Sequence, residues 1–245
     1  MREYDDLTYG DRIAEFYDDL YGDVGEDAIS LLEELSAGGD ALELGIGTGR
    51  VALPLAARSV SVTGIDASPA MVEKLRAKPG GDRIPVVMGS FAEIPIDRAF
   101  DLIFVVFNTF FALSTQEEQI ACFRSVAAHL EDCGHFLLEV FVPDLGRFED
   151  HQAVRLIDLS DETVRLDVAE HDIVNQQVSS QHVMIRRKGV RLFPVKLRYA
   201  WPSELDLMAK LAGLTLKERW GSWQREPLTK DSTKHISIYG KVDET

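Results

Sequence analysis

The chain contains little cysteine and no long apolar segment. Its two cysteines, Cys122 and Cys133, are too few for a disulfide framework, and their spacing matches no zinc motif. No run reaches the roughly 18 apolar residues of a membrane-spanning helix. The charged start of the chain, residues 1–6, lacks the apolar segment of a secretion signal. We therefore expect a cytoplasmic protein that has no metal centre and does not bind a membrane.

Basic residues are scarce relative to acidic ones. The chain has 26 Lys and Arg against 41 Asp and Glu, so its formal net charge is −15 at pH 7. A surface of this sign repels the phosphate backbone of nucleic acids, so DNA and RNA are poor candidate partners. The remaining composition is ordinary for a globular protein: 45% of the 245 residues are hydrophobic, enough for one α/β domain with an insertion.

Strand and helix patterns alternate through the first 142 residues. Two helices are expected first, and short apolar stretches then alternate with segments of helical periodicity. The expected strands are residues 41–45, 60–65, 84–88, 100–107 and 135–142, and the expected helices are residues 9–21, 28–35, 51–57, 69–77 and 116–130. This order predicts a parallel, doubly wound sheet.

The pattern changes after Pro143. No long helical stretch is present in residues 153–198, and the alternation there predicts strands joined by short polar turns. These strands are residues 154–159, 163–171, 177–186 and 190–199. The α/β pattern then resumes with a helix over 202–212, for which Ser203 is a candidate N-cap, and with strands over 214–220 and 236–239.

Because the α/β pattern resumes, the intervening strands are interpreted as an antiparallel insertion rather than as a separate domain. We expect an N-terminal helical cap over residues 1–40 and a core over 41–150. The insertion covers 151–200, where it can form a substrate lid or a dimer contact, and residues 201–245 complete the core.

Residues 43–50, with the sequence Glu-Leu-Gly-Ile-Gly-Thr-Gly-Arg, are the most informative segment of the chain. A strand that turns into a helix through three glycines lets a ligand contact bare backbone. Gly45 and Gly47 allow a tight turn and close approach, and Gly49 lets the following helix pack near the strand. Free N–H groups at that helix N-terminus attract a carboxylate. A dinucleotide fingerprint needs its third glycine at the position of Arg50, so the segment does not match an NAD site.

The second predicted strand ends in an acid at the spacing of a ribose site. Asp66 lies 21 residues (66 − 45) after Gly45, and its two carboxylate oxygens match two ribose hydroxyls. The alternative is an acid that is favoured by the dipole of the next helix. Ser68, which precedes Pro69, can cap that helix without Asp66.

Residues 43–50, 64–68, 89–91 and 100–108 occur in the order of the motifs of class I S-adenosylmethionine (SAM)-dependent methyltransferases. The chain resembles the members of this family that act on small molecules, over residues 41–142 and again over 213–240. The resemblance implies a Rossmann-like, doubly wound, seven-stranded and mostly parallel sheet whose last strand is antiparallel, with the antiparallel insertion after strand five. It also implies SAM as cofactor, S-adenosylhomocysteine (SAH) as product, and methyl transfer to a small molecule by direct SN2 displacement.

The resemblance also implies roles for individual residues. Glu43 would lie near the methionine amino group, and the backbone at Gly45 and Gly47 would contact the methionine part. Asp66 would bind the ribose. The remaining contacts, to the adenine, would come from Ala67 and Met71.

After the third strand the family often has an acid that contacts the adenine amino group. Here the residues are Gly89, Ser90 and Phe91, so a serine replaces the acid. A hydroxyl can still accept a hydrogen bond from the amino group, and Phe91 can pack on the ring.

Two further segments extend the expected cofactor site. Tyr9 and Tyr17 belong to an N-terminal helix that resembles the helix covering SAM in this family, where they would contact the cofactor or pack in the core. Asn108 follows the fourth strand and could face SAM or the substrate, or could cap a turn. Enzymes that methylate the amino groups of nucleic acids have prolines at this position, whereas residues 107–111 of this chain contain none.

The sequence says less about which residues bind the methyl acceptor. Among the histidines of the later strands, His182 is the preferred candidate for a general base, which is needed only where the acceptor must lose a proton. Arg198 could clamp an anionic acceptor, and Phe111 and Trp201 could line its pocket. The sequence does not indicate which atom of the acceptor receives the methyl group. The insertion could also join two copies of the chain in a homodimer.

Two other functions remain at this stage. A NAD(P)-linked oxidoreductase would need the third glycine at position 50 and a Tyr-x-x-x-Lys-like pair, and neither is present. A protein that binds SAM without catalysis is the second alternative, because a positioning enzyme needs no particular base.

Overall fold

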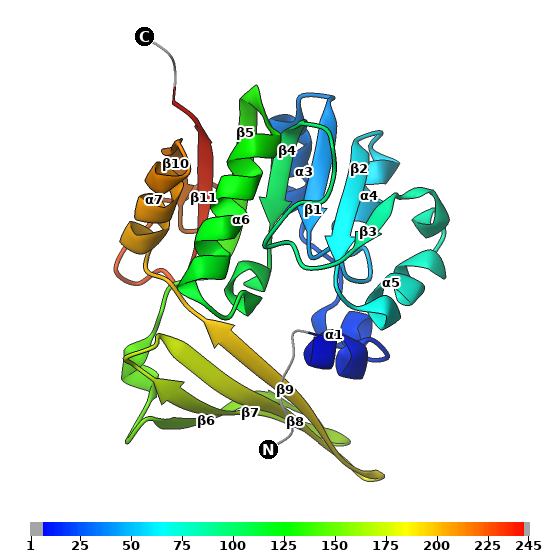
Figure 1. The fold of residues 1–245 in the computed structure, drawn as a ribbon. Coiled ribbons are helices and arrows are strands. Elements are labelled where there is room, and N and C mark those ends of the chain that lie inside the picture. The colour runs from blue at the N-terminus through cyan, green and yellow to red at the C-terminus, as the bar shows by residue number, and fades with distance from the viewer. Residues whose placement is uncertain (1–6, 243–245) are drawn as a thin grey trace.

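A seven-stranded sheet with the order β10-β11-β5-β4-β1-β2-β3 forms the centre of the computed structural model, which describes residues 7–242 and the side chains from residue 10 on (Figure 1). Its strands are β1 (Asp40–Leu44), β2 (Ser61–Asp66), β3 (Val86–Met88), β4 (Phe100–Val105), β5 (Leu130–Phe141), β10 (Leu214–Trp220) and β11 (Lys234–Lys241). Strands β1 to β5 are parallel, and β11 is antiparallel to both of its neighbours, β5 and β10. The predicted Rossmann-like sheet with an antiparallel last strand is confirmed.

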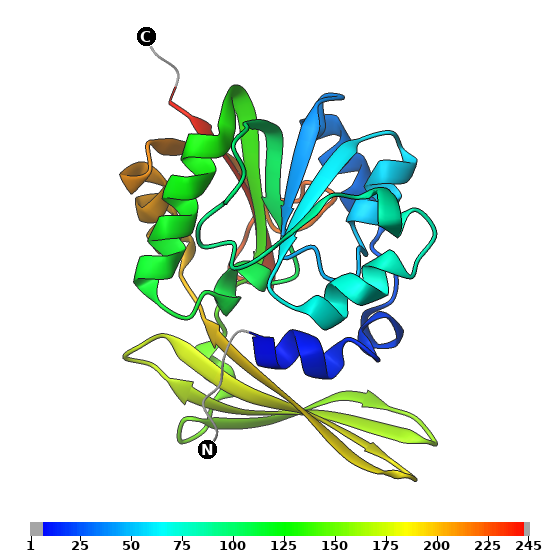
Figure 2. The same cartoon turned by 45° about the vertical axis from the view of Figure 1, so that its right-hand side comes forward.

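Helices pack on both faces of this sheet (Figure 2). Helices α6 (Gln116–His129) and α7 (Pro202–Leu211) bury their apolar sides on one face. Helices α3 (Glu26–Ser36), α4 (Ala52–Ala57) and α5 (Pro69–Arg76) bury theirs on the other. Strands covered on both sides need apolar residues at nearly every position, which explains the continuous apolar run of β4.

Local capping explains where two of these helices begin. Thr115 and Glu118 form a reciprocal capping box at the start of α6. The Ser68 side chain accepts a hydrogen bond from the Met71 N–H at the start of α5. The prediction that Ser203 caps α7 is wrong. Trp201 occupies the N-cap position without a side-chain hydrogen bond, and the fixed φ of Pro202 starts the helix.

The helix predicted over residues 9–21 is two short helices, α1 (Leu7–Ile13) and α2 (Tyr17–Tyr21). The helix breaks before Phe16, whose ring lies 6.0 Å from the ring of Phe193 on the insertion. Tyr17 lines a cavity at the end of β1 that is described below. Packing toward two different parts of the fold therefore overrides the continuous helical pattern.

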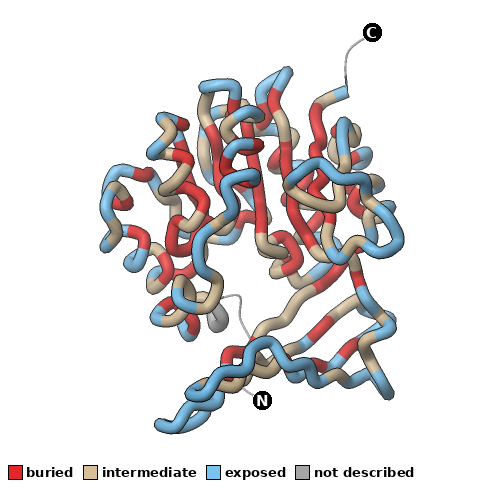
Figure 3. Tube along the Cα trace, turned by 180° about the vertical axis from the view of Figure 1, so that it is seen from behind, coloured by how far each residue is buried: buried red, intermediate tan, exposed pale blue. Residues whose placement is uncertain are grey.

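The insertion is a four-stranded antiparallel sheet with the order β6-β7-β8-β9. Its strands are β6 (Gln152–Leu159), β7 (Thr163–Asp172), β8 (Gln177–Arg186) and β9 (Gly189–Arg198). Figures 1 and 2 place it beyond the carboxyl ends of the parallel strands, with α1 between it and the core. Figure 3 shows that buried residues gather in the seven-stranded sheet, whereas the insertion is mostly exposed or half-buried.

Within residues 7–242, no helix has the length and apolar content needed to cross a membrane. Cys122 is buried in α6, whereas Cys133 is exposed on β5, which begins at Leu130, earlier than predicted. Short 3₁₀ turns, residues 81–83, 109–112 and 145–147, complete the described elements.

Candidate active site

The glycine loop after β1 has the backbone conformations that its sequence predicts. Gly45, Gly47 and Gly49 have φ values of 75°, 55° and 79°, a region that favours glycine. A Cβ atom on Gly45 would lie 2.5 Å from Cγ2 of Thr109, so the loop passes too close to the β4 turn for any side chain.

Gly49 serves packing. A Cβ atom there would lie 2.4 Å from Cδ1 of Leu75 on α5. The glycine therefore lets α5 approach the loop, whereas the helix that the sequence predicted to pack there, α4, is less close, with Cγ of Leu53 at 3.2 Å from the same Cβ position. Gly49 is not among the residues that line the cavity.

Glu43 is a buried carboxylate with an unused oxygen. Its side chain lies at the end of β1 with 3% exposure, and Oε2 has no hydrogen-bond partner. Burial and then the nearby Asp66 carboxylate raise the pKa of Glu43 well above its usual value. A buried acceptor without a partner is costly, and an ammonium group placed here would satisfy it. The methionine amino group of SAM has this chemistry.

Asp66 ends β2 and is held by backbone donors. Its Oδ2 accepts a hydrogen bond from the Gly47 N–H at 2.7 Å, and its Oδ1 accepts one from the Ser68 N–H at 2.8 Å. Burial raises the pKa of Asp66 despite these hydrogen bonds. A carboxylate has about four acceptor sites, so Asp66 can still accept a hydrogen bond from a ribose hydroxyl.

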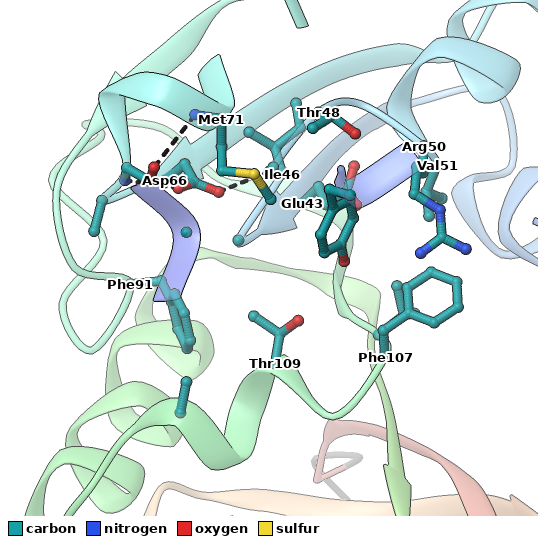
Figure 4. Close-up of a pocket in the computed structure, with 18 of the residues that line it drawn as sticks. Glu43, Ile46, Thr48, Arg50, Val51, Asp66, Met71, Phe91, Phe107 and Thr109 are labelled. Atoms are coloured by element: carbon teal, nitrogen blue, oxygen red, sulfur yellow. Dashed lines mark hydrogen bonds between the residues drawn. The ribbon is translucent and has the colours of Figure 1, made fainter. Parts of the chain in front are cut away.

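One cavity joins these groups, and we call it the cofactor cavity. Figure 4 shows Asp66 and Met71 on one side of it, Arg50 and Phe107 on the other, and Phe91 and Thr109 at its border. Of the predicted cofactor residues, those that line it are Tyr17, Glu43, Gly45, Gly47, Asp66, Ala67, Met71, Ser90 and Phe91. Gly89 and Asn108 are not among its lining residues, and the side chain of Tyr9 lies outside the part of the chain that is described.

Arg50 is a residue of this cavity that the sequence analysis missed. Its guanidinium carbon lies 4.3 Å from the ring centroid of Phe107 and 5.6 Å from that of Tyr17. It also donates hydrogen bonds to the carbonyl oxygens of Gly22 and Tyr21. Burial raises the pKa of Tyr17 to about 12, so this phenol stays protonated at neutral pH. In the sequence, position 50 is notable only because it lacks the third glycine of a dinucleotide fingerprint. No sequence pattern predicts that its side chain stacks on aromatic rings.

A second set of contacts fixes α2 to the glycine loop. The Thr48 hydroxyl donates to Oδ1 of Asp18 at 2.6 Å, and Nζ of Lys78 lies 2.7 Å from Oδ2. Burial opposes ionisation of Asp18, but the hydrogen bonds from Lys78 and Thr48 outweigh it and lower its pKa. The N-terminal helices are therefore anchored to the loop by charge as well as by aromatic packing.

The turn after β4 separates the cofactor cavity from a second one. Phe107 and Asn108 both have positive φ, 58° and 64°, an uncommon conformation for residues with side chains. Asn108 Oδ1 accepts a hydrogen bond from the Phe141 N–H at 2.6 Å, and the Phe107 N–H donates to Oε2 of Glu139. Asn108 thus has the turn-holding role that was the alternative interpretation, and it lines the second cavity.

The second cavity, about 500 Å³, lies between the core and the insertion, and we call it the acceptor cavity. Its walls come from the ends of β4 and β5, the segment before β11, and the insertion. The lining residues are Asn108, Phe141, Val142, Pro143, Asp144, Leu145, Arg147, Phe148, Arg155, Val178, Tyr199, Lys230, Asp231, Ser232 and Thr233. They combine an apolar wall with charges of both signs, which suits an organic ligand that has polar groups.

A buried tyrosine–histidine pair supports this cavity. The Tyr199 hydroxyl lies 2.9 Å from Nε2 of His171, and the imidazole stacks on Phe148 at 4.6 Å. Burial lowers the pKa of His171 and raises that of Tyr199, so both groups are neutral at pH 7. In the tautomer that carries its proton on Nδ1, the imidazole accepts a hydrogen bond from the Tyr199 hydroxyl, whose oxygen keeps lone pairs for a ligand.

The residues that the sequence predicts for the acceptor do not line this second cavity. Nε2 of His182 lies 3.9 Å from the buried Asp167, on the side of the insertion that packs against α2. Burial lowers the pKa of His182. Neither His182 nor Arg198, Phe111 or Trp201 is among the described residues that line the cofactor or acceptor cavity.

Arg198 is part of a buried network in place of the predicted clamp position. Nη1 donates to Oε1 of Gln119 and Nη2 to Oε1 of Glu204, each at 2.7 Å. Hydrogen bonds from Gln176 and Arg198 outweigh burial and lower the pKa of Glu204. Phe111 is fully buried against Phe141, behind the cavity wall.

Comparisons with known proteins find methyltransferases. A methyltransferase domain family matches residues 41–134. The structure of the CcbJ methyltransferase from Streptomyces caelestis is 38% identical, covers 98% of this chain and 100% of its own, and superposes with a TM-score of 0.91. The cypemycin N-terminal methyltransferase from a Streptomyces species is 29% identical over 198 residues, which are 80% of this chain and 81% of that protein. SAM-bound CalS10 from Micromonospora echinaspora, an amino pentose methyltransferase, shares the fold at 19% identity, with a TM-score of 0.68 over 97% of this chain and 98% of its own.

Proposed function

Because the chain belongs to the class I SAM-dependent methyltransferases that act on small molecules, we propose that the cofactor cavity holds SAM and that an amine acceptor binds in the acceptor cavity. The observation that carries this proposal is the turn between the two cavities. Phe107 and Thr109 line the cofactor cavity, whereas Asn108 between them lines the acceptor cavity. A group bound on one side of this turn is therefore one residue away from a group bound on the other.

On the cofactor side, two carboxylates orient the bound molecule. The unpartnered Oε2 of Glu43 accepts from the ammonium group of the methionine part. Asp66, already held by Gly47 and Ser68, accepts from the ribose hydroxyls. Phe91 packs against the adenine, and the Ser90 hydroxyl is near enough to the cavity to replace the usual acid.

SAM, when bound, supplies an electrophilic methyl group on a positively charged sulfur. The protein's own task is alignment and the exclusion of water. Arg50 stacks on Phe107 on the side of the cavity opposite Asp66 (Figure 4), and its guanidinium also lies near the ring of Tyr17. Asn108 holds the turn against β5 and so keeps Phe107 and Thr109 in place.

The acceptor is an amine nitrogen in this proposal. Support comes from the cypemycin enzyme, whose name gives an N-terminal amine as its site of methylation. An unprotonated amine attacks with its own lone pair and loses a proton only after transfer, so the reaction needs no strong base before the attack. Asp144 and Asp231 in the lining can accept hydrogen bonds from such an amine.

The location of the protein is also part of the proposal. Cys122 and Cys133 are both free thiols, which suits a reducing compartment. The net charge of −15 supports small molecules rather than nucleic acids as partners. We place the enzyme in the cytoplasm on these grounds.

Methyl transfer from labelled SAM to matched acceptors tests the nucleophile. Suitable pairs are a peptide with a free N-terminus and its N-acetylated form, and an amino sugar and the parent sugar. We expect label only on the members with a free amine, with the methyl group located on nitrogen by mass spectrometry and NMR. Transfer to oxygen or carbon of the blocked members would contradict the amine assignment.

A further inference from the structure

Glu139 is a buried carboxylate to which the proposed reaction gives no role. It lies on β5, opposite Ile236 of β11, and its side chain is 6% exposed. It is not among the described residues that line the cofactor cavity or the acceptor cavity. A carboxylate removed from water is costly unless charges and hydrogen bonds compensate it. The bonds that its two oxygens make therefore indicate what it does.

One oxygen of Glu139 holds the turn after β4. Oε2 accepts a hydrogen bond from the Phe107 N–H at 3.1 Å, and the backbone oxygen of Glu139 accepts one from the Asn108 N–H at 3.2 Å. Phe107 and Asn108 have positive φ, a conformation that persists only where the surroundings fix it. Phe107 carries the ring on which Arg50 stacks in the cofactor cavity. Glu139 therefore helps to fix one wall of that cavity.

The other oxygen of Glu139 holds residues 221–233, which join β10 to β11 and which we call the C-terminal loop. Nε1 of Trp223 donates a hydrogen bond to Oε1 at 3.2 Å, and Nζ of Lys234, directly after the loop, donates one at 2.8 Å. The end of this loop, residues 230–233, lines the acceptor cavity. One carboxylate thus bonds both the wall of the cofactor cavity and the loop that borders the acceptor cavity.

A second route joins the same two parts without the Glu139 side chain. Asn108 Oδ1 accepts a hydrogen bond from the Phe141 N–H at 2.6 Å. The N–H of the next residue, Val142, donates to the carbonyl oxygen of Thr233 at 2.9 Å. Because the bonds on the β5 side of this route come from the backbone, a substitution of the Glu139 side chain separates the two routes.

We infer that Glu139 is a positioning residue that couples the two cavities. The inference rests on the proposed function, in which Phe107 borders bound SAM. SAM restricts Phe107, and the two oxygens of Glu139 carry this restriction to Trp223 and Lys234. The C-terminal loop is then held more tightly when SAM is bound, so the acceptor meets a cavity wall that is already ordered and loses less entropy on binding. Glu139 supports methyl transfer through alignment, without contact to SAM or the acceptor.

Hydrogen exchange of the full chain, with and without saturating SAH, tests this coupling by mass spectrometry. SAH occupies the cofactor cavity and leaves the acceptor cavity empty, so no acceptor has to be known. In wild type we expect slower exchange in residues 45–50 and 66–71, which belong to the cofactor cavity. We also expect exchange at least about threefold slower in the C-terminal loop, because fewer local openings remain there.

Glu139→Gln keeps the size of the side chain and removes one of its two acceptor oxygens. Either the Phe107 N–H or the donors of Trp223 and Lys234 then lose their partner. We expect SAH to protect residues 45–50 in this variant as in wild type, and the protection of the C-terminal loop to disappear. A purely structural role would instead speed exchange equally in the free and the SAH-bound protein.

Two further variants make the test specific. Lys234→Met removes a bond on the loop side only, and it should reduce the protection of the C-terminal loop while SAH affinity stays unchanged. Glu204→Gln is the matched control, because Glu204 is also a largely buried carboxylate that bonds a cation, Arg198. It should keep the wild-type response of the loop to SAH.

The outcomes separate this inference from the proposed function. Failure of SAH to bind wild type would contradict the proposed function. Protection of residues 45–50 in wild type without protection of the C-terminal loop would overturn the coupling alone. Undiminished loop protection in Glu139→Gln would assign the coupling to Asn108 and Phe141 and overturn the role of Glu139.

The remaining variants also decide. Loss of loop protection in Glu204→Gln as well would contradict a specific role of Glu139. Lys234, whose side chain is 40% exposed, allows a test even where Glu139→Gln does not fold. Undiminished loop protection in Lys234→Met would then overturn the coupling through Oε1.

Discussion

The Gly47 N–H donates a hydrogen bond to Oδ2 of Asp66 at 2.7 Å, and this bond joins the two parts of the cofactor site. The glycine loop follows β1 and the carboxylate ends β2, yet each positions the other. Because Gly47 has a φ of 55°, only a residue that tolerates this conformation presents its N–H to Asp66 without strain.

Gly47→Ala should therefore weaken SAM binding. The left-handed conformation costs a residue with a side chain about 1–2 kcal/mol, and relief of that strain moves the N–H away from Asp66. We expect an affinity about tenfold lower by calorimetric titration. Gly38→Ala is the control: Gly38 has a φ of 80°, and nothing lies within 4 Å of an added Cβ. That variant should lose similar stability and keep its SAM affinity, and equal affinity losses in both would contradict the explanation.

Glu43→Gln should change how the stability of the SAM-free protein depends on pH. The pKa of Glu43 is raised in the folded state above its usual 4.5, so the folded state binds its proton more tightly than the unfolded state. The free energy of unfolding therefore falls as pH rises above about 4.5, until the folded pKa is passed. Glu43→Gln removes this contribution, so its stability relative to wild type should increase with pH in urea titrations, while its SAM affinity falls. A constant difference between the two proteins from pH 4 to 8 would contradict the raised pKa.

Arg198→Ala should destabilise the fold without a specific effect on acceptor binding. The guanidinium and the Glu204 carboxylate are largely buried, with side-chain exposures of 8% and 17%. Removal of one partner from a buried pair costs about 3–5 kcal/mol. Arg191→Ala is the control, because its ion pair with Glu15 is exposed, and it should cost well under about 1 kcal/mol. A variant that unfolds like wild type but has a much higher acceptor KM would support the clamp that the sequence suggested.

The sequence was sufficient for the fold where one pattern determines one element. Strand β8 (Gln177–Arg186) and strand β10 (Leu214–Trp220) have the predicted bounds, and the insertion is where the alternation predicted it. The error over residues 9–21 has a tertiary cause, since Phe16 and Tyr17 pack toward different parts of the molecule. No local pattern encodes that choice.

For the site, the predicted residues of one side lie together in the structure and those of the other side do not. Glu43, Gly47 and Asp66 line the cofactor cavity because the ends of parallel strands always meet at one edge of a sheet. The acceptor cavity depends on how the insertion docks on the core, which sequence spacing does not define. His182 and Arg198 both belong to strands of the insertion, and neither lines that cavity.

Tyr199→Phe should affect the acceptor and not SAM. The substitution removes the hydrogen bond to His171 and leaves Nε2 of a buried imidazole without a partner. We expect a several-fold higher acceptor KM with unchanged SAM affinity, once an acceptor is found. Tyr239→Phe is the matched control, because its buried hydroxyl bonds Asp206 and Arg219 away from both cavities. It should lower stability only, and equal KM changes in the two variants would argue against a role of Tyr199 in the cavity.

Calorimetric titration of SAM into wild type and Asp66→Ala tests the central claim most directly. Asp97→Ala, which removes an exposed acid outside the cavity, is the control for the change in charge. We predict one SAM per chain in wild type, with binding weakened by about 1–3 kcal/mol in Asp66→Ala and unchanged in Asp97→Ala. Equal affinity in wild type and a folded Asp66→Ala protein would contradict the cofactor site described here.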